Sequence, residues 1–194
     1  MVRAMFAALG WPVSEHPGRP GEQYNCGQSK NAGVHATPGI PEDVFVLADA
    51  DCVTTAATLR EAVWLAYQAP GVVWTGDSIR ILDRDTTERI TSWEGAAAET
   101  PYGEVRPADS TPQLLTIRRD FFDRVGGYDE AYVGYGFEDY DFRQRCAALA
   151  PLRAAHGTIV HLWHEPDREK VEPGELYEAN RARWLAAGGI PWQP

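Results

Sequence analysis

The stretch Val44-Phe45-Val46-Leu47-Ala48-Asp49-Ala50-Asp51 decides how the rest of this sequence is interpreted. Its first five residues form an apolar run of strand length, typical of a strand covered on both faces in a parallel α/β sheet. Carboxylates two residues apart in an extended chain point to the same side. Because open α/β sheets bind ligands at the carboxyl ends of their strands, Asp49 and Asp51 are candidate ligands of Mg²⁺ or Mn²⁺ holding a diphosphate. The alternative is that one of them caps the helix that begins near Thr54 while the other is solvated.

Strands and helices alternate on both sides of this stretch, which predicts an α/β fold. Besides 44–48, the expected strands are 72–74, 78–82, 114–117 and 158–162. The expected helices are 2–9, 28–36, 54–68, 119–125, 138–149 and 175–187. We expect one domain over 1–194, with an irregular N-terminal segment over 1–21, a long loop over about 83–112 of the kind that closes over ligands, and a C-terminal helix and tail over 173–194.

The composition, 44% hydrophobic and 24% charged over 194 residues, is that of an ordinary globular protein. With 18 basic and 28 acidic residues the net charge is −10, which disfavours a nucleic-acid partner without excluding it. No run of about 18 apolar residues is present, so no membrane span is expected, and the N-terminus lacks a signal-peptide pattern. Three widely spaced cysteines form no Cys-x-x-Cys pair, so we expect a protein of the reducing cytoplasm.

A second cluster consists of Gly126-Gly127-Tyr128-Asp129-Glu130 and Gly134-Tyr135-Gly136-Phe137-Glu138-Asp139-Tyr140-Asp141. Its acidic residues begin a predicted helix, where they would interact favourably with the helix dipole even without a function. The glycines allow the backbone to approach a ligand, the aromatic rings offer flat faces to a sugar, and a carboxylate could serve as a general base. A helix N-terminus lowers the pKa of a carboxylate and burial raises it, and the sequence leaves that balance open.

A third cluster, His161-Leu162-Trp163-His164, follows the predicted strand over 158–162. Two histidines three residues apart at a strand end are better candidates for metal ligands than a lone histidine, which is usually structural. Together with two aspartates they would also suit a zinc hydrolase, so these clusters alone leave the reaction open.

Taken together and in this order, these residues resemble the GT-A glycosyltransferases, most closely the galactosyltransferase-type and family-2-like catalytic region. The matching motifs are Lys30-Asn31-Ala32-Gly33, Asp49-Ala50-Asp51, Gly126-Gly127-Tyr128-Asp129-Glu130, Tyr135-Gly136-Phe137-Glu138-Asp139-Tyr140-Asp141 and His161-Leu162-Trp163-His164. The resemblance covers roughly residues 22–166 and implies a Rossmann-like GT-A fold with a mixed, mostly parallel sheet and flanking helices. The usual first strand has no counterpart, so the fold is expected to be N-terminally shortened. Another segment or a partner chain, such as a second copy, would then complete the nucleoside pocket, or the enzyme would be impaired.

For the donor side, the resemblance implies a metal ion, Mn²⁺ or Mg²⁺, bridging the diphosphate of a nucleotide sugar. Asp49 and Asp51 would contact the ribose and the metal, and His164 would complete the metal shell, with His161 as the weaker candidate. The positions implied to bind the nucleotide are Tyr24, Asn25, Lys30, Asn31 and Asp49.

For the acceptor side, the resemblance places Asp139 at the position of the catalytic base of inverting members, which deprotonates the acceptor hydroxyl. Glu138 and Asp141 would hold the acceptor or order the site, and Tyr135 with Gly136 would lie against the sugar. The retaining branch usually lacks an aspartate at the position of Asp139, which favours inversion.

The leading hypothesis is therefore a metal-dependent, inverting glycosyltransferase that moves a sugar from a UDP-sugar to an acceptor hydroxyl, on a glycan or another molecule. One alternative is a non-catalytic nucleotide- or sugar-binding relic of such an enzyme, which would bind without turnover. A less favoured alternative is a metal-dependent hydrolase, which release of free phosphate or cleavage of a phosphodiester would identify.

Overall fold

The computed structural model describes residues 1–17, 23–90, 92–93, 104–107, 113–165 and 174–189. Two four-stranded sheets form its core. The first has the order β1 (Val44–Ala48), β6 (Leu114–Arg118), β3 (Val72–Trp74), β7 (Arg153–Ala154), and the second has the order β2 (Cys52–Val53), β8 (Thr158–His161), β4 (Ser78–Ile81), β5 (Glu104–Pro107). The helices are α1 (Val2–Ala8), α2 (Cys26–Ala36), α3 (Ala56–Gln68), α4 (Arg84–Arg89), α6 (Arg119–Val125), α7 (Glu138–Leu149) and α9 (Glu175–Ala186).

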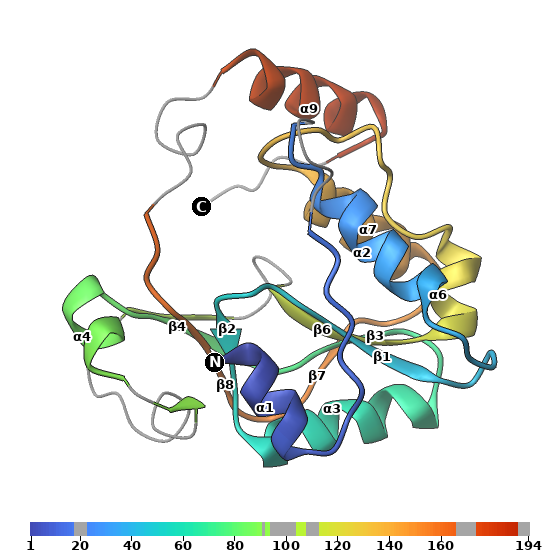
Figure 1. Cartoon of the computed structure of the whole chain (residues 1–194). Helices are drawn as coiled ribbons and strands as arrows, with labels where there is room; N and C mark the ends of the chain where they lie inside the picture. The colour runs from blue at the N-terminus through green and yellow to red at the C-terminus, as the bar shows by residue number, and fades with distance from the viewer. Residues whose placement is uncertain (18–22, 91, 94–103, 108–112, 166–173, 190–194) are drawn as a thin grey trace.

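Helices cover both faces of the first sheet (Figure 1). On one face, Ala62 and Ala66 of α3 pack against Val73 of β3. On the other face, α2, α6 and α7 contribute buried side chains to a larger cluster with the sheet, among them Val34, Phe121, Phe122, Phe142 and Cys146. The small alanines let α3 approach the sheet closely, whereas the aromatic rings fill the wider space on the opposite face.

The mixed sheets and flanking helices confirm the predicted fold class, but the expected predominance of parallel pairing is wrong. Among the described strands only β3–β7 and β4–β8 are parallel, and the other four pairs are antiparallel. The decisive strand β1 pairs antiparallel with β6 and with no other described strand, and only Leu47 in it is fully buried. An apolar run gives no information on the direction of its neighbours, and it fits the edge of a covered sheet as well as its centre.

The segment over 83–112, expected to be one long loop, contains two regular elements. Asp83 caps α4, since its carboxylate accepts a hydrogen bond from the Thr86 backbone at 2.7 Å, and β5 pairs antiparallel with β4. A six-residue helix lacks the periodicity by which longer helices are recognised, and a strand of four residues shows little alternation. Residues 18–22, 91, 94–103, 108–112, 166–173 and 190–194 lie outside the described residues.

The side chain of Asn31 joins α2 to the turn before the acidic helix α7. Its Oδ1 accepts a hydrogen bond from the Tyr128 backbone N–H at 2.8 Å. Its Nδ2 donates to the Tyr128 carbonyl and to Glu130 Oε1, both at 2.9 Å. Gly127 adopts φ +65°, and a Cβ there would lie 2.6 Å from Asn31 Oδ1, so the close approach requires glycine. These bonds hold the turn in register with α2.

We predict that Asn31→Ala lowers the free energy of unfolding by about 2–4 kcal/mol, because it leaves buried backbone groups of Tyr128 without partners. Urea unfolding followed by circular dichroism measures the change. His35→Ala, at an exposed position of the same helix, serves as the control and should cost no more than about 0.5 kcal/mol. Equal effects of the two substitutions would contradict the role assigned to Asn31.

Candidate functional site

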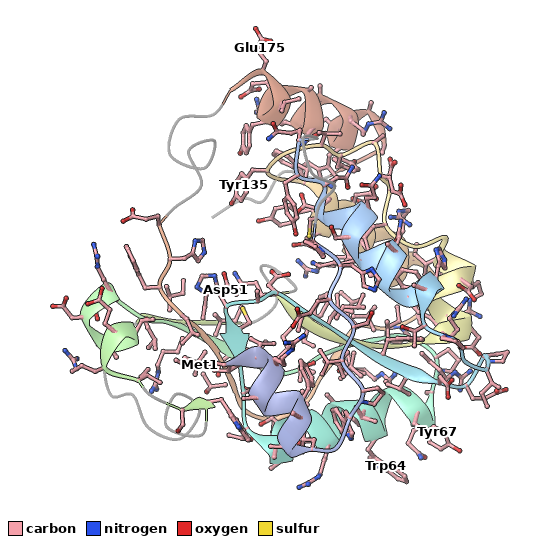
Figure 2. The ribbon with its side chains drawn as sticks, in the orientation of Figure 1. Met1, Asp51, Trp64, Tyr67, Tyr135 and Glu175 are labelled. Atoms are coloured by element: carbon pink, nitrogen blue, oxygen red, sulfur yellow. The ribbon has the colours of Figure 1, made fainter. Side chains whose placement is uncertain are left out.

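A groove of about 1610 Å³ runs along β1 and α2 to the N-terminus of α7. It contains ten of the residues predicted for the site, namely Tyr24, Lys30, Asp49, Asp51, Tyr135, Gly136, Glu138, Asp139, His161 and His164. Figure 2 shows Asp51 on the side of the sheets and Tyr135 on the side of α7 and α9. At its far end the groove is lined by α1 and residues 11–17. The groove therefore brings together the predicted metal ligands and the predicted acceptor residues.

One end of the site is a cluster of a carboxylate and two imidazoles. Asp51 Oδ2 lies 3.2 Å from His164 Nε2 and 3.6 Å from His161 Nε2. The fold creates this proximity because β2 pairs antiparallel with β8, which places Cys52 opposite His161 and Asp51 one residue beyond. Oxygen and imidazole nitrogen donors so arranged fit Mn²⁺ and, less fully, Mg²⁺, which prefers oxygen.

Cys52 lies beside this cluster, and the sequence interpretation did not select it. Its Sγ is within reach of Asp51 and His161 as a third metal-ligand candidate. However, burial raises the pKa of the Cys52 thiol well above its usual range, and Sγ donates to Asp51 Oδ1 at 3.3 Å. As a protonated thiol, Sγ is a weak donor atom for a metal ion, and loss of its proton would add it to the carboxylate and imidazole ligands. In a regular strand the side chains of neighbouring residues point to opposite faces, so Cys52 would be expected to point away from Asp51. The turn over 49–51 interrupts the strand, and the two side chains come together.

Lys30 connects the two halves of the site. Its Nζ lies 3.4 Å from Asp49 Oδ1 and 3.3 Å from Asp139 Oδ1, and its side chain is only 9% exposed. Burial raises the pKa of Asp49 to about 6, against the opposing effect of Lys30. Burial would lower the pKa of Lys30, but Asp139 and Asp49 hold it well above its usual range. Lys30 therefore remains a cation between a strand-end carboxylate and a helix-start carboxylate.

The turn before α7 has a backbone geometry that aims its acidic residues into the groove. Phe137 is the one described residue other than glycine with positive φ, at 76°. Its ring packs against Tyr177 and Trp184 of α9, with centroids 5.1 and 5.3 Å away, and these contacts stabilise the unfavourable conformation. At Gly136, with φ +101°, a Cβ would lie 3.2 Å from the Tyr177 ring. The sequence predicted the helix over 175–187, but it did not predict that α9 packs against this turn, because a contact between distant segments leaves no local signal.

Glu138 has a carboxylate oxygen that is buried away from water. Its Oε2 is buried and has no hydrogen-bond partner among the described residues. Burial, followed by the charge of Asp139, raises the pKa of Glu138 to about 7. At this residue burial outweighs the helix N-terminus, which settles the balance that the sequence left open.

Three predicted site residues contact other parts of the protein instead of the groove. Asn25 caps α2 and donates to the Glu130 carbonyl at 2.7 Å, and Asn31 binds the Tyr128 backbone. Asp141 is paired with Arg145 at 2.8 Å. The guanidinium of Arg145 also donates to the carbonyls of Val125 and Gly127. These contacts stabilise the turn before α7. The predicted ligand-binding roles of the three residues stay predictions.

The raised pKa of Glu138 gives a prediction for stability. A carboxyl whose pKa is about 7 in the folded protein, against its ordinary 4.5, binds its proton more tightly when folded. This contribution to the free energy of unfolding is therefore present at low pH and falls as pH rises through that window. In metal-free buffer, Glu138→Gln should match the wild type to within about 0.5 kcal/mol near pH 4.5 and be more stable by about 3 kcal/mol at pH 8. Parallel pH dependences in urea unfolding would contradict the assignment.

Comparisons with known proteins bear on the fold and on one segment of the chain. Residues 113–154, from β6 to β7 and including the turn before α7, match the family model described as the N-terminal domain of galactosyltransferase. Among solved structures, the chain is similar to a mutant of Drosophila β1,4-galactosyltransferase 7 in complex with manganese, UDP-Gal and xylobiose. It is equally similar to the catalytic domain of the same Drosophila enzyme with xylobiose.

In both cases the TM-score is 0.51 and the identity 16%, over 93% of this chain and 70% of the other. No curated protein sequence matches the chain. Within the described residues, no helix combines the length and apolar character needed to cross a membrane. The chain thus has the GT-A fold of a galactosyltransferase catalytic domain, and residues 113–154 carry the sequence pattern of a galactosyltransferase domain.

Proposed function

We propose that this protein is a metal-dependent, inverting glycosyltransferase that moves a sugar from a nucleotide sugar to an acceptor hydroxyl. The observation that carries the proposal is one groove in which an Asp-His-His cluster and the carboxylate of Asp139 face a common space, with Lys30 between Asp49 and Asp139. A nucleotide sugar has its diphosphate next to the reacting carbon, so such a donor would reach both ends of this site.

On the donor side, Asp51, His164 and His161 would hold Mn²⁺, with Mg²⁺ as the alternative. When bound, the metal would supply positive charge to the departing diphosphate. Asp49 lies beside this cluster for contact with the ribose, and Lys30 offers a buried ammonium to the phosphates. Residues 11–17 line the groove next to β1, which supports the alternative that another segment of the chain completes the nucleoside pocket.

On the acceptor side, Asp139 would accept the proton of the attacking hydroxyl. The acceptor oxygen forms a bond to the anomeric carbon as the bond from that carbon to the diphosphate breaks, and one such displacement inverts the configuration. Glu138, with its pKa of about 7, would be partly protonated at neutral pH and could donate a hydrogen bond to an acceptor oxygen. Tyr135 offers a ring to the sugar, stacked at 6.3 Å on Tyr177.

The ligands named for the structural relatives suggest where a substrate screen should start. UDP-Gal and xylobiose are bound by the Drosophila enzyme with the same fold. UDP-galactose is therefore the first donor to test, and a xylose-containing glycan the first acceptor. Donor selectivity rests on small differences in contact energy, so other UDP-sugars belong in the same screen.

We predict that Asp139→Asn lowers the turnover number for sugar transfer by about 100-fold or more, because the amide cannot accept the proton. Binding of UDP with Mn²⁺, measured by calorimetry, should change by no more than about 3-fold, since Asp49 still pairs with Lys30. Asp123→Asn, at an exposed position of α6, is the matched control and should transfer sugar at the wild-type rate. Normal turnover by the Asp139 variant would rule out its assigned role.

A further inference from the structure

The short segment after β8, residues 162–165, carries His164 into the groove. Its start is fixed to the sheet, because the Leu162 backbone N–H donates to the Asp51 carbonyl at 2.8 Å and the Leu162 side chain is buried. The imidazole of His164 itself is 47% exposed, so packing of the ring does not fix its position. The backbone on either side of His164 must therefore determine where its Nε2 points.

Helix α4 holds this segment through two contacts to Trp163 and through an ion pair of Arg84 with Glu165 at 4.0 Å. The backbone N–H of Trp163 donates to Thr87 Oγ1 at 2.9 Å. The guanidinium carbon of Arg84 lies 5.0 Å from the centre of the Trp163 ring, in cation–π geometry. The parallel pairing of β4 with β8 brings α4, which follows β4, alongside the residues that follow β8.

The helix is itself anchored, so it can serve as a fixed support. Asp83 caps its N-terminus, Thr86 is buried, and the backbone N–H of Leu82 donates to the His161 carbonyl at 3.0 Å. Arg84 is further oriented by Glu88, at 2.7 Å. A hydroxyl and a guanidinium from one anchored turn therefore restrain the residue that precedes His164.

The two ring nitrogens of His164 face different partners, which defines the orientation of the ring. Nδ1 lies 2.8 Å from the carbonyl oxygen of Glu165. A neutral imidazole donates its Nδ1–H to that carbonyl, which leaves the lone pair of Nε2 on the side of Asp51, 3.2 Å away. A hydrogen bond of this kind at the second ring nitrogen is what orients histidines that bind metals. The position of the Glu165 carbonyl in turn depends on how the backbone at Trp163 is held.

We propose that Thr87 and Arg84 are positioning residues, which hold the 162–165 segment so that His164 Nε2 is presented to a divalent cation beside Asp51. The inference rests on the proposed function only in assuming that this cluster binds a metal. Neither residue is among those that line the groove. Each restricts the freedom of the His164 backbone before the metal arrives, which reduces the ordering cost of binding.

The test is Mn²⁺ affinity, measured by the electron paramagnetic resonance signal of free Mn²⁺ in titrations of the whole chain in the presence of UDP. Thr87→Val keeps the shape of the side chain and removes the hydroxyl, and it should raise the Mn²⁺ dissociation constant about 10-fold. Thr87→Ser restores the hydroxyl and should stay within about 2-fold of the wild type. A serine variant as weak as the valine variant would overturn the role of the hydroxyl.

Arg84→Met tests the contacts of Arg84, because it keeps a long unbranched side chain and removes the cation that lies over Trp163 and pairs with Glu165. It should also raise the Mn²⁺ dissociation constant, by about 3- to 10-fold. Glu88→Gln is its control, since it removes the same Arg84–Glu88 ion pair and leaves the guanidinium at the ring. If Glu88→Gln weakens Mn²⁺ binding as much as Arg84→Met, the lost ion pair explains the effect and the role of Arg84 is overturned.

Hydrogen exchange at the Trp163 amide provides a readout without metal. Thr87→Val should speed this exchange and leave that of α3 unchanged. Wild-type affinity for Mn²⁺ in Thr87→Val, or unchanged exchange at Trp163, would overturn the inference while the proposed function stands. A wild-type protein that binds no Mn²⁺ at all would contradict the proposed metal site, and the positioning role with it.

Discussion

The site depends on the ammonium of Lys30, which lies between carboxylates brought from two distant parts of the chain. A buried charge is tolerated only when it is paired, and here Asp49 and Asp139 provide the pairing at 3.4 and 3.3 Å. The pairing of Lys30 with Asp49 and Asp139 affects the geometry of the site as well as its charge. The strand end that holds Asp49 and the helix start that holds Asp139 are kept at a fixed distance, each within reach of the same cation.

Much of the surrounding structure maintains that arrangement. Asn31, next to Lys30 on α2, binds the turn at Tyr128, and Arg145 binds the carbonyls of the same turn from α7. The rings of Tyr177 and Trp184 in α9 pack against Phe137 and stabilise its left-handed backbone conformation. Apart from Phe137, the residues that make these contacts do not line the groove, yet they determine where Glu138 and Asp139 point within it.

The sequence predicted which residues share the groove better than it predicted how the strands pair. Asp49, Asp51, Asp139 and both histidines meet in one groove, because each lies at the end of a regular element whose apolar pattern marks its bounds. Strand direction was not predictable, since the side-chain pattern of β1 is the same beside a parallel or an antiparallel neighbour.

Other features of the site depend on contacts between segments far apart in the chain. Asn31 and Asp141 are polar residues within a recognisable motif, but only the fold shows that their partners are backbone groups and Arg145. The closeness of Thr87 to Trp163 likewise follows from the pairing of β4 with β8. A single sequence carries no local signal for such contacts.

The central claim is that the acidic strand end and the histidines bind a nucleotide diphosphate through a divalent cation. Calorimetric titration of UDP into the protein, with Mn²⁺ and again with EDTA, tests this claim most directly. The account predicts binding with Mn²⁺ that becomes at least about 10-fold weaker with EDTA, because the metal links the phosphates to Asp51 and the histidines. Equal affinity under both conditions, or no binding under either, would contradict it.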